Sequence, residues 1–216
     1  MDFLAVYEAL VTCGGGAPFA GRVKEMRRQF EERTGPFGPD DPWFEARSGA
    51  FWDDALTTQG FAAVVAPSVA RAMQADAARW VAPFARAHRG LFHPEPNESG
   101  WRLIDAWSGA EFVVNPLDPG LQEALRAATV LDGRVVARDA PMEIALLPGA
   151  IFHPADATEP IARVLEAARE RGIGTCETLD ALLRMERSLR SLSRVKASYA
   201  YRPENLAMAR KIVQKP

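Results

Sequence analysis

The sequence of 216 residues is poor in cysteine and histidine, and both scarcities restrict the chemistry that it can carry. The two cysteines, Cys13 and Cys176, lie far apart and outside any C-x-x-C pair, which argues against a disulfide framework and a thiolate zinc site. The three histidines, His88, His93 and His153, lack the paired spacing of metal ligands. We therefore expect a cytoplasmic protein with reduced thiols, no bound metal ion and no cofactor.

The chain also lacks long apolar runs and a basic leader. No run approaches the roughly 20 apolar residues that span a bilayer. Asp2 and Glu8 do not fit the basic start of a secretory signal. The net charge of −2 gives no overall attraction to nucleic acid or to an anionic membrane. We expect no membrane partner.

A complete phosphate-binding loop is missing as well, although the segment from Gly16 to Val23 comes close to one. In the pattern G-x-x-x-x-G-K-[ST], Arg22 occupies the lysine position and Val23 the hydroxyl position. Residues 2–12, which precede the glycines, have the apolar spacing of a helix rather than of the strand that such a loop follows. We interpret the glycines as a helix end followed by a turn.

Among the features that are present, the first is helical periodicity over the N-terminal part of the chain. Apolar residues at intervals of three and four predict a helical layer. The expected helices cover 2–12, 20–33, 41–60 and a segment from Ser68 toward His88 that Pro83 kinks or splits.

From about residue 90 to residue 153 the pattern changes to short strands separated by turn residues. Ser108-Gly109 predicts a hairpin, Asp132-Gly133 a turn before a strand, and Asp118-Pro119 the start of a helix. Helical patterns return after residue 155, with a long helix expected from Thr178 to about Val195 and a short one from Pro203.

These patterns predict an α+β fold with N-terminal helices, a small central and mainly antiparallel sheet, and a C-terminal helical arm. We place the helical layer at 1–89, the sheet region with its flanking helices at 90–171, and the basic arm at 172–216.

Asp105 and Cys176 also suggest chemistry, apart from the basic residues of the arm. Strand alternation places Asp105 on the same face as Trp101 and Trp107, where it either caps the adjoining turn or forms a perturbed functional carboxylate. Cys176 lies near the start of a helix, where the helix dipole favours a thiolate. Packing alone is the simpler explanation of the cysteine.

The strongest unusual feature is the distribution of charge. Residues 184–216 contain nine basic and two acidic side chains, so this segment carries +7 and the remainder of the chain −9. The arginines recur at helical spacing on one stripe and the leucines on another. The candidate partner-binding residues are Arg184, Arg187, Leu189, Arg190, Leu192, Arg194 and Lys196.

We expect a non-enzymatic interaction or regulatory protein whose arm binds a protein partner or a second copy of the chain. One alternative is nucleic-acid binding by the same arm, with Tyr199 and Tyr201 available to stack on bases. Another is a small enzyme near the sheet, with Asp105, His93 or His153 as proton carriers. Internal pairing of the basic arm with the acidic body would remove the basis of both arm hypotheses.

Overall fold

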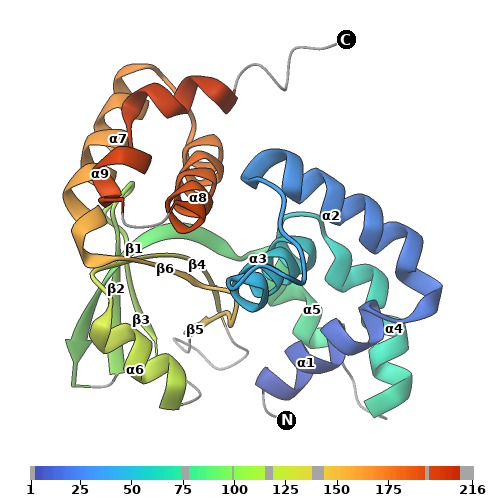
Figure 1. Ribbon diagram of the computed structural model, residues 1–216. Helices are drawn as coiled ribbons and strands as arrows, with labels where there is room; N and C mark the ends of the chain where they lie inside the picture. Colours follow the sequence, from blue (N-terminus) through green and yellow to red (C-terminus); the bar gives the residue numbers. More distant parts are fainter. Residues whose placement is uncertain are drawn as a thin grey trace.

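The computed structural model describes residues 3–73, 78–98, 100–114, 119–137, 144–192 and 195–209. Its N-terminal helices lie together on one side of the molecule (Figure 1). They are α1 (Phe3–Gly14), a single 3-10 turn η1 (Ala17–Phe19), α2 (Ala20–Thr34), α3 (Phe44–Thr57), α4 (Phe61–Met73) and α5 (Ala78–Ala85). The helical layer predicted from periodicity is therefore present.

The start predicted for the fourth helix, Ser68, is wrong. Helix α4 begins at Phe61 and contains Pro67 in its interior. Proline removes one hydrogen bond to the preceding turn, which a packed helix can tolerate. The chain is instead interrupted at Gly60, whose φ of 65° is a left-handed conformation that favours glycine.

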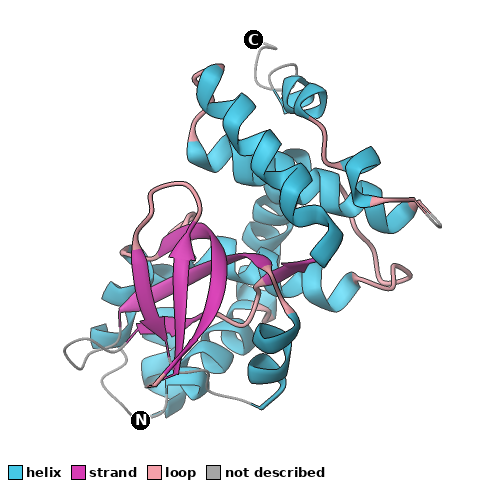
Figure 2. Ribbon diagram, turned by 90° about the vertical axis from the view of Figure 1, so that its left-hand side faces the viewer, coloured by secondary structure: helices cyan, strands magenta, loops and turns pink. Residues whose placement is uncertain are grey.

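The central sheet is small, mixed and barrel-like (Figure 2). Its strands are β1 (His88–Asn97), β2 (Gly100–Asp105), β3 (Glu111–Val114), β4 (Val130–Ala137), β5 (Ile144–Leu146) and β6 (Ile151–His153), with α6 (Pro119–Ala127) between β3 and β4. The strands β1-β2-β3-β5-β4 form a closed sheet because β1 also pairs with β4. Strand β6 pairs with β4 as well, next to the part of β4 that pairs with β5. Only β3 and β5 pair in parallel among these strands.

The predicted hairpin at Ser108-Gly109 is confirmed, since β2 and β3 pair antiparallel on either side of it and Gly109 has a φ of 73°. The turn predicted at Asp132-Gly133 is wrong, because both residues lie inside β4. A β-carbon on Gly133 would lie 2.9 Å from the Cδ1 atom of Leu146. The glycine therefore leaves room for the side chains of Leu146 and Leu131 rather than forming a turn.

The C-terminal helices pack on the body of the protein. They are η2 (Ala155–Ala157), α7 (Thr158–Glu170), α8 (Thr175–Ser191), α9 (Ala197–Ala200) and η3 (Pro203–Ala209). Helix α8 contacts α2 of the N-terminal layer, β1 of the sheet and α7. In Figure 1 it lies between the C-terminal helices and the N-terminal layer.

Three apolar clusters fill the fold. One joins the N-terminal helices to β4 and β5, one lies inside the barrel under α6, and one is formed by α7, α8 and the segment after them. Among the described helices, no single one has both the length and the apolar composition to cross a membrane, and one bent pair, α1 with η1–α2, meets these criteria only when taken together.

Candidate functional site

An alternating chain of three arginines and three aspartates runs through the centre of the molecule. Each residue inside this chain of charges bonds to two oppositely charged neighbours, and each of the two end residues bonds to one. The order is Asp132, Arg89, Asp180, Arg33, Asp54 and Arg134. These residues belong to β4, β1, α8, α2 and α3, so the ion pairs join the N-terminal helices and α8 to the barrel.

Asp54 holds two of the arginines. Its Oδ2 atom accepts from Nη2 of Arg33 at 2.5 Å and its Oδ1 atom from Nη2 of Arg134 at 2.7 Å. Gln59 donates a further bond to Oδ2 at 3.0 Å. The burial of Asp54 raises its pKa, but Arg134 and Arg33 outweigh this effect and keep the pKa below its usual range. Asp54 is therefore a buried anion, and both of its carboxylate oxygens accept hydrogen bonds.

Arg89 is held by two carboxylates. Its Nη2 and Nε atoms donate to the two oxygens of Asp132 at 2.9 and 3.2 Å, which is the bidentate geometry of a strong arginine–carboxylate pair. Its Nη1 atom donates to Oδ1 of Asp180 at 2.6 Å. Burial alone would lower the pKa of Arg89, and the two aspartates raise it instead.

A cleft of about 530 Å³ opens where the helical layer, the barrel and the first turn of α8 meet. This volume lies within the range of sites for small molecules. Apart from Phe84, Ala85, Ala87, Trp107 and Cys176, its lining is polar: Arg33, Thr57, Thr58, His88, Arg89, Asp105, Ser108, Arg134 and Thr175. We call this site the arginine cleft.

The arginine cleft exposes the cations of the charge chain and not its anions. Arg33, Arg89 and Arg134 line it, whereas Asp54, Asp132 and Asp180 do not. The side chains of Arg33, Arg89 and Arg134 are 35%, 9% and 4% exposed, so the guanidinium groups extend from the rim to the interior. A ligand in the cleft would meet these three guanidinium groups and the carboxylate of Asp105, whereas the aspartates that pair with the arginines do not line the cleft.

Arg134 is incompletely satisfied. A guanidinium carries five N–H donors. In the described part of the chain Arg134 makes one side-chain hydrogen bond, from Nη2 to Asp54, and its buried Nε atom has no partner. Burial, followed by the nearby Arg89, lowers the pKa of Arg134, although a guanidinium remains charged at neutral pH. A buried cation with free donors is costly unless another acceptor binds it.

Asp105 lines the cleft from the end of β2, and the explanation that it caps the adjoining turn is confirmed. It caps the hairpin, since its carboxylate accepts from Oγ of Ser108 at 2.5 Å and from the backbone N–H of Trp107 at 3.1 Å. It also pairs with Nε2 of His88 at 3.2 Å. The cleft therefore contains an oriented histidine, whose ring stacks on Phe112 at a centroid distance of 5.1 Å.

Cys176 is exposed and lines the same cleft from the first turn of α8. Gly174 precedes this 17-residue helix in an extended conformation, and the backbone N–H groups of the first helical turn have no acceptor within the helix. The other free thiol, Cys13, is half-buried at the end of α1 and does not line the cleft.

Two arginines of the predicted partner-binding stripe bond to the chain's own backbone. Arg184 donates from Nη1 to the carbonyl of Arg33, and Arg187 donates from Nε to the carbonyl of Pro36. Arg47, fully buried, donates to the carbonyl of Thr34 at 2.6 Å. The last carbonyl groups of a helix need such partners, so Arg184 and Arg47 cap α2, and Arg187 bonds to the segment that follows it.

The remaining residues of the stripe lie in different surroundings. Arg190 pairs with the buried Glu186 one turn earlier on α8. Leu189 packs against the C-terminal apolar cluster, whereas Leu192 is 50% exposed and Lys196 is exposed. Arg194 lies outside the described residues.

His93 and His153, the other expected proton carriers, do not line the cleft. His93 bonds through Nδ1 to the carbonyl of Thr129 at 2.9 Å, and His153 bonds through Nδ1 to the hydroxyl of Tyr201 at 2.7 Å. Burial lowers the pKa of His153 to about 4, so it is neutral. Over the described residues, no group of three or more histidine, cysteine and acidic side chains is placed to hold a metal ion.

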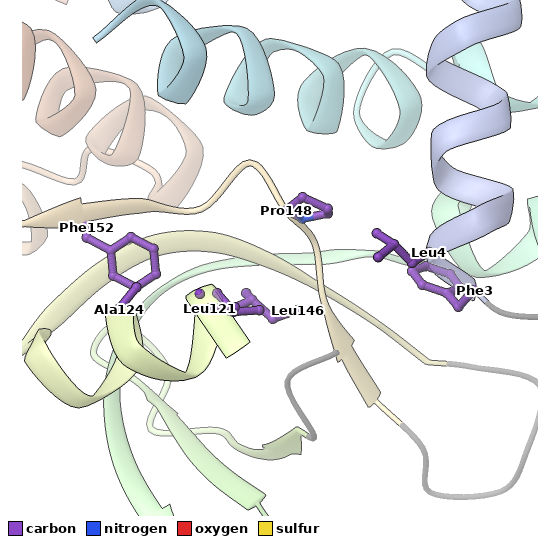
Figure 3. Close-up of a pocket in the computed structure, with 8 residues that line it drawn as sticks. Phe3, Leu4, Leu121, Ala124, Leu146, Pro148 and Phe152 are labelled. Atoms are coloured by element: carbon purple, nitrogen blue, oxygen red, sulfur yellow. The ribbon is translucent and has the colours of Figure 1, made fainter. Parts of the chain in front are cut away.

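A second cavity, of about 270 Å³, is apolar (Figure 3). It lies between α1, α6 and the segment from β5 to β6, with Leu4, Leu121, Leu146 and Phe152 among its walls. None of its lining residues is titratable. Of these two cavities, only the arginine cleft is lined by several polar and charged groups, so it is the better candidate for a functional site.

Sequence reasoning identified Asp105 and Cys176 and missed the arginines of the cleft. One signal was available: the otherwise apolar strand Val130–Ala137 contains Asp132 and Arg134. A charged pair in an apolar strand indicates buried partners elsewhere in the chain. The partners themselves come from four other elements, and no local spacing connects them.

The fold and the cleft together define an α+β protein with an internal ion-pair network and a cleft lined in part by arginines. Comparison of the chain with protein-family models, curated proteins and solved structures finds no match. The proposals below therefore depend on the geometry of the chain itself.

Proposed function

We propose that the protein binds a small anionic molecule in the arginine cleft. The observation that carries this proposal is Arg134, a nearly buried guanidinium that lines the cleft and has an unpartnered Nε atom. A phosphate or carboxylate oxygen is the acceptor that complements a guanidinium best.

Two further features support an anionic ligand. Arg33 and Arg89 line the same cleft, and the first turn of α8 contributes Thr175 and Cys176, where the positive end of a helix dipole is located. Trp107 offers an apolar surface beside these groups, with the guanidinium of Arg169 5.1 Å from its ring centroid.

Isothermal titration of the full chain with pyrophosphate, with citrate and with neutral glycerol tests the proposal and distinguishes a phosphate from a carboxylate ligand. We expect saturable binding of at least one anion at one site per chain and none of glycerol. Arg134→Gln should weaken this binding at least tenfold, whereas Arg102→Gln, on the exposed face of β2, should leave it unchanged. Absence of binding by every anion to the folded protein would overturn the proposal.

We retain as a second proposal that the segment after α8 contacts a protein partner or a second copy of the chain. Leu192 and Tyr199, 50% and 59% exposed, flank the exposed Lys196. Sedimentation equilibrium over a range of concentrations tests self-association, which Leu192→Asp should abolish. The nucleic-acid alternative loses support, because Arg184 and Arg187 already bond to backbone carbonyls.

We propose a cytoplasmic location as well, and both free thiols support it. An exposed thiol such as that of Cys176 persists in a reducing compartment.

A further inference from the structure

Cys176 is an exposed thiol inside a cleft whose lining includes three arginines and one aspartate, Asp105. Arg33, Arg89 and Arg134 share the lining with it, and α8 begins directly before it. A cysteine at a helix start carries no function by itself. Here the nearly buried Arg134 adds an independent sign of a ligand, because its Nε atom lacks a partner.

The charge of the cleft should select among reagents that react with the thiol. Three guanidinium groups and one carboxylate line the cleft, and an excess of one sign of charge raises the local concentration of oppositely charged molecules. His88, oriented by Asp105 at 3.2 Å, supplies a proton acceptor in the same cleft. Cys13 lies outside the cleft and has neither feature.

We propose that Cys176 is a site of covalent modification by anionic disulfides, such as small peptide disulfides that carry carboxylates. The inference rests on the proposed anion-binding function and adds a reactive group to it. The carboxylates would lie against the arginines and hold the disulfide beside the thiol.

The exchange is balanced without a further oxidant. The thiolate of Cys176 attacks one sulfur of the disulfide and forms a new S–S bond, and the original S–S bond breaks. The leaving sulfur takes the electron pair and is protonated by solvent, while the thiol proton of Cys176 passes to His88 or water. The disulfide is reduced to one free thiol as Cys176 is oxidised to the mixed disulfide.

The test compares two aromatic disulfides that differ in charge. In a Cys13→Ser background, the rates of reaction of Cys176 with dianionic 5,5′-dithiobis(2-nitrobenzoate) and with neutral 2,2′-dithiodipyridine are measured. A short cysteine peptide serves as the reference for intrinsic reactivity. We expect the anionic-to-neutral rate ratio to exceed that of the peptide at least about tenfold at low salt and to fall as salt is added.

Two variants assign the selectivity to the cleft. Thr175→Glu adds a negative charge beside Cys176 at a position where helices favour acids, so the fold is retained and the ratio should fall toward that of the peptide. Arg28→Gln removes a positive charge from the same helix as Arg33 but outside the cleft, and should not change the ratio. Pyrophosphate should slow the anionic reagent more than the neutral one.

The outcomes separate this inference from the proposed function. A ratio equal to that of the peptide overturns the inference, whether or not anions bind. If titration of the same protein still shows pyrophosphate or citrate binding, the proposed function stands. If neither anion binds, both proposals fall. A raised ratio that salt and Thr175→Glu abolish supports the inference.

Discussion

Arg134 of β4 donates a hydrogen bond from Nη2 to Oδ1 of Asp54 of α3 over 2.7 Å. The two residues are 80 positions apart, and their bond joins the barrel to the N-terminal helical layer. Since Asp54 also accepts from Arg33, it is the point where three elements of the fold meet electrostatically.

We expect Asp54→Ala to be strongly destabilising. The substitution leaves Arg134, nearly buried, without its carboxylate, and removing one partner of a buried ion pair costs about 3–5 kcal/mol. Urea unfolding followed by circular dichroism measures the loss. Glu32→Ala, which removes an exposed partner of Arg28, should leave the unfolding midpoint unchanged. Equal midpoints for the two variants would contradict the role given to Asp54.

A close backbone contact between Gly49 and Gly149 gives a second expectation. A β-carbon on Gly149 would overlap the carbonyl group of Gly49, where no flexible side chain can yield. Gly149→Ala should therefore destabilise the protein by about 1–3 kcal/mol or more. Gly21→Ala, in α2 with open space around it, should be neutral or stabilising because alanine favours helices. Thermal unfolding of both variants checks the difference in sign.

The pH dependence of stability should contain two opposing contributions. Burial raises the pKa of Asp53 to about 7 despite bonds from Tyr7 and Gly149, so the folded protein retains a proton that the unfolded chain releases near pH 4. This contribution to stability is lost as pH rises from about 4 to 7. His153, with its pKa lowered to about 4, contributes stability that is present above pH 6.5 and lost as pH falls toward 4.

Single variants should reveal each contribution. Asp53→Asn can still accept from Gly149 and donate to the Tyr7 hydroxyl, so its stability should rise with pH from 4 to 6.5 more steeply than that of the wild type. His153→Gln should instead lose stability over this range. Each change amounts to roughly 3–4 kcal/mol at most, since one pKa unit corresponds to about 1.4 kcal/mol. Urea midpoints at half-unit pH intervals test this, and unchanged slopes would refute it.

Arg184, which caps α2, and Arg187, which bonds to the segment after it, give a fourth expectation. Replacing Arg184 and Arg187 together with Glu should lower the free energy of unfolding by more than about 2 kcal/mol, because carbonyl groups of Arg33 and Pro36 lose their donors and meet anions instead. Lys196 is exposed and follows the end of α8, so Lys196→Glu should not lower the free energy of unfolding in this way. Urea unfolding distinguishes these two arginines from a free binding surface, on which both changes would be tolerated.

Local patterns predicted the elements of this fold well. Apolar spacing of three and four identified the N-terminal helices, and turn residues identified the hairpin at Ser108-Gly109, because these signals depend on neighbours in the sequence. The same rules failed at Asp132-Gly133. There the aspartate is the partner of Arg89, which lies 43 residues earlier, and no local pattern records that pairing.

The arginine cleft could be predicted only in part. Asp105 and Cys176 were recognisable by their positions within single elements, and the structure places both in the cleft. Arg33, Arg89 and Arg134 come from a helix and two strands, and their common environment exists only after the barrel closes against α2 and α8. The basic stripe on α8 was visible in sequence, but its contacts with the end of α2 depend on tertiary packing.

The capping of α2 by α8 has a consequence for synthesis. Helix α2 ends at Thr34, yet residue 184, which donates to its end, and residue 187, which donates to Pro36 just after it, are added by the ribosome about 150 residues later. In nascent chains that lack these residues, only water can bond to these carbonyl groups. The N-terminal layer therefore completes its hydrogen bonding after most of the polypeptide has emerged, and truncated products should be recognised by chaperones and proteases as unfinished.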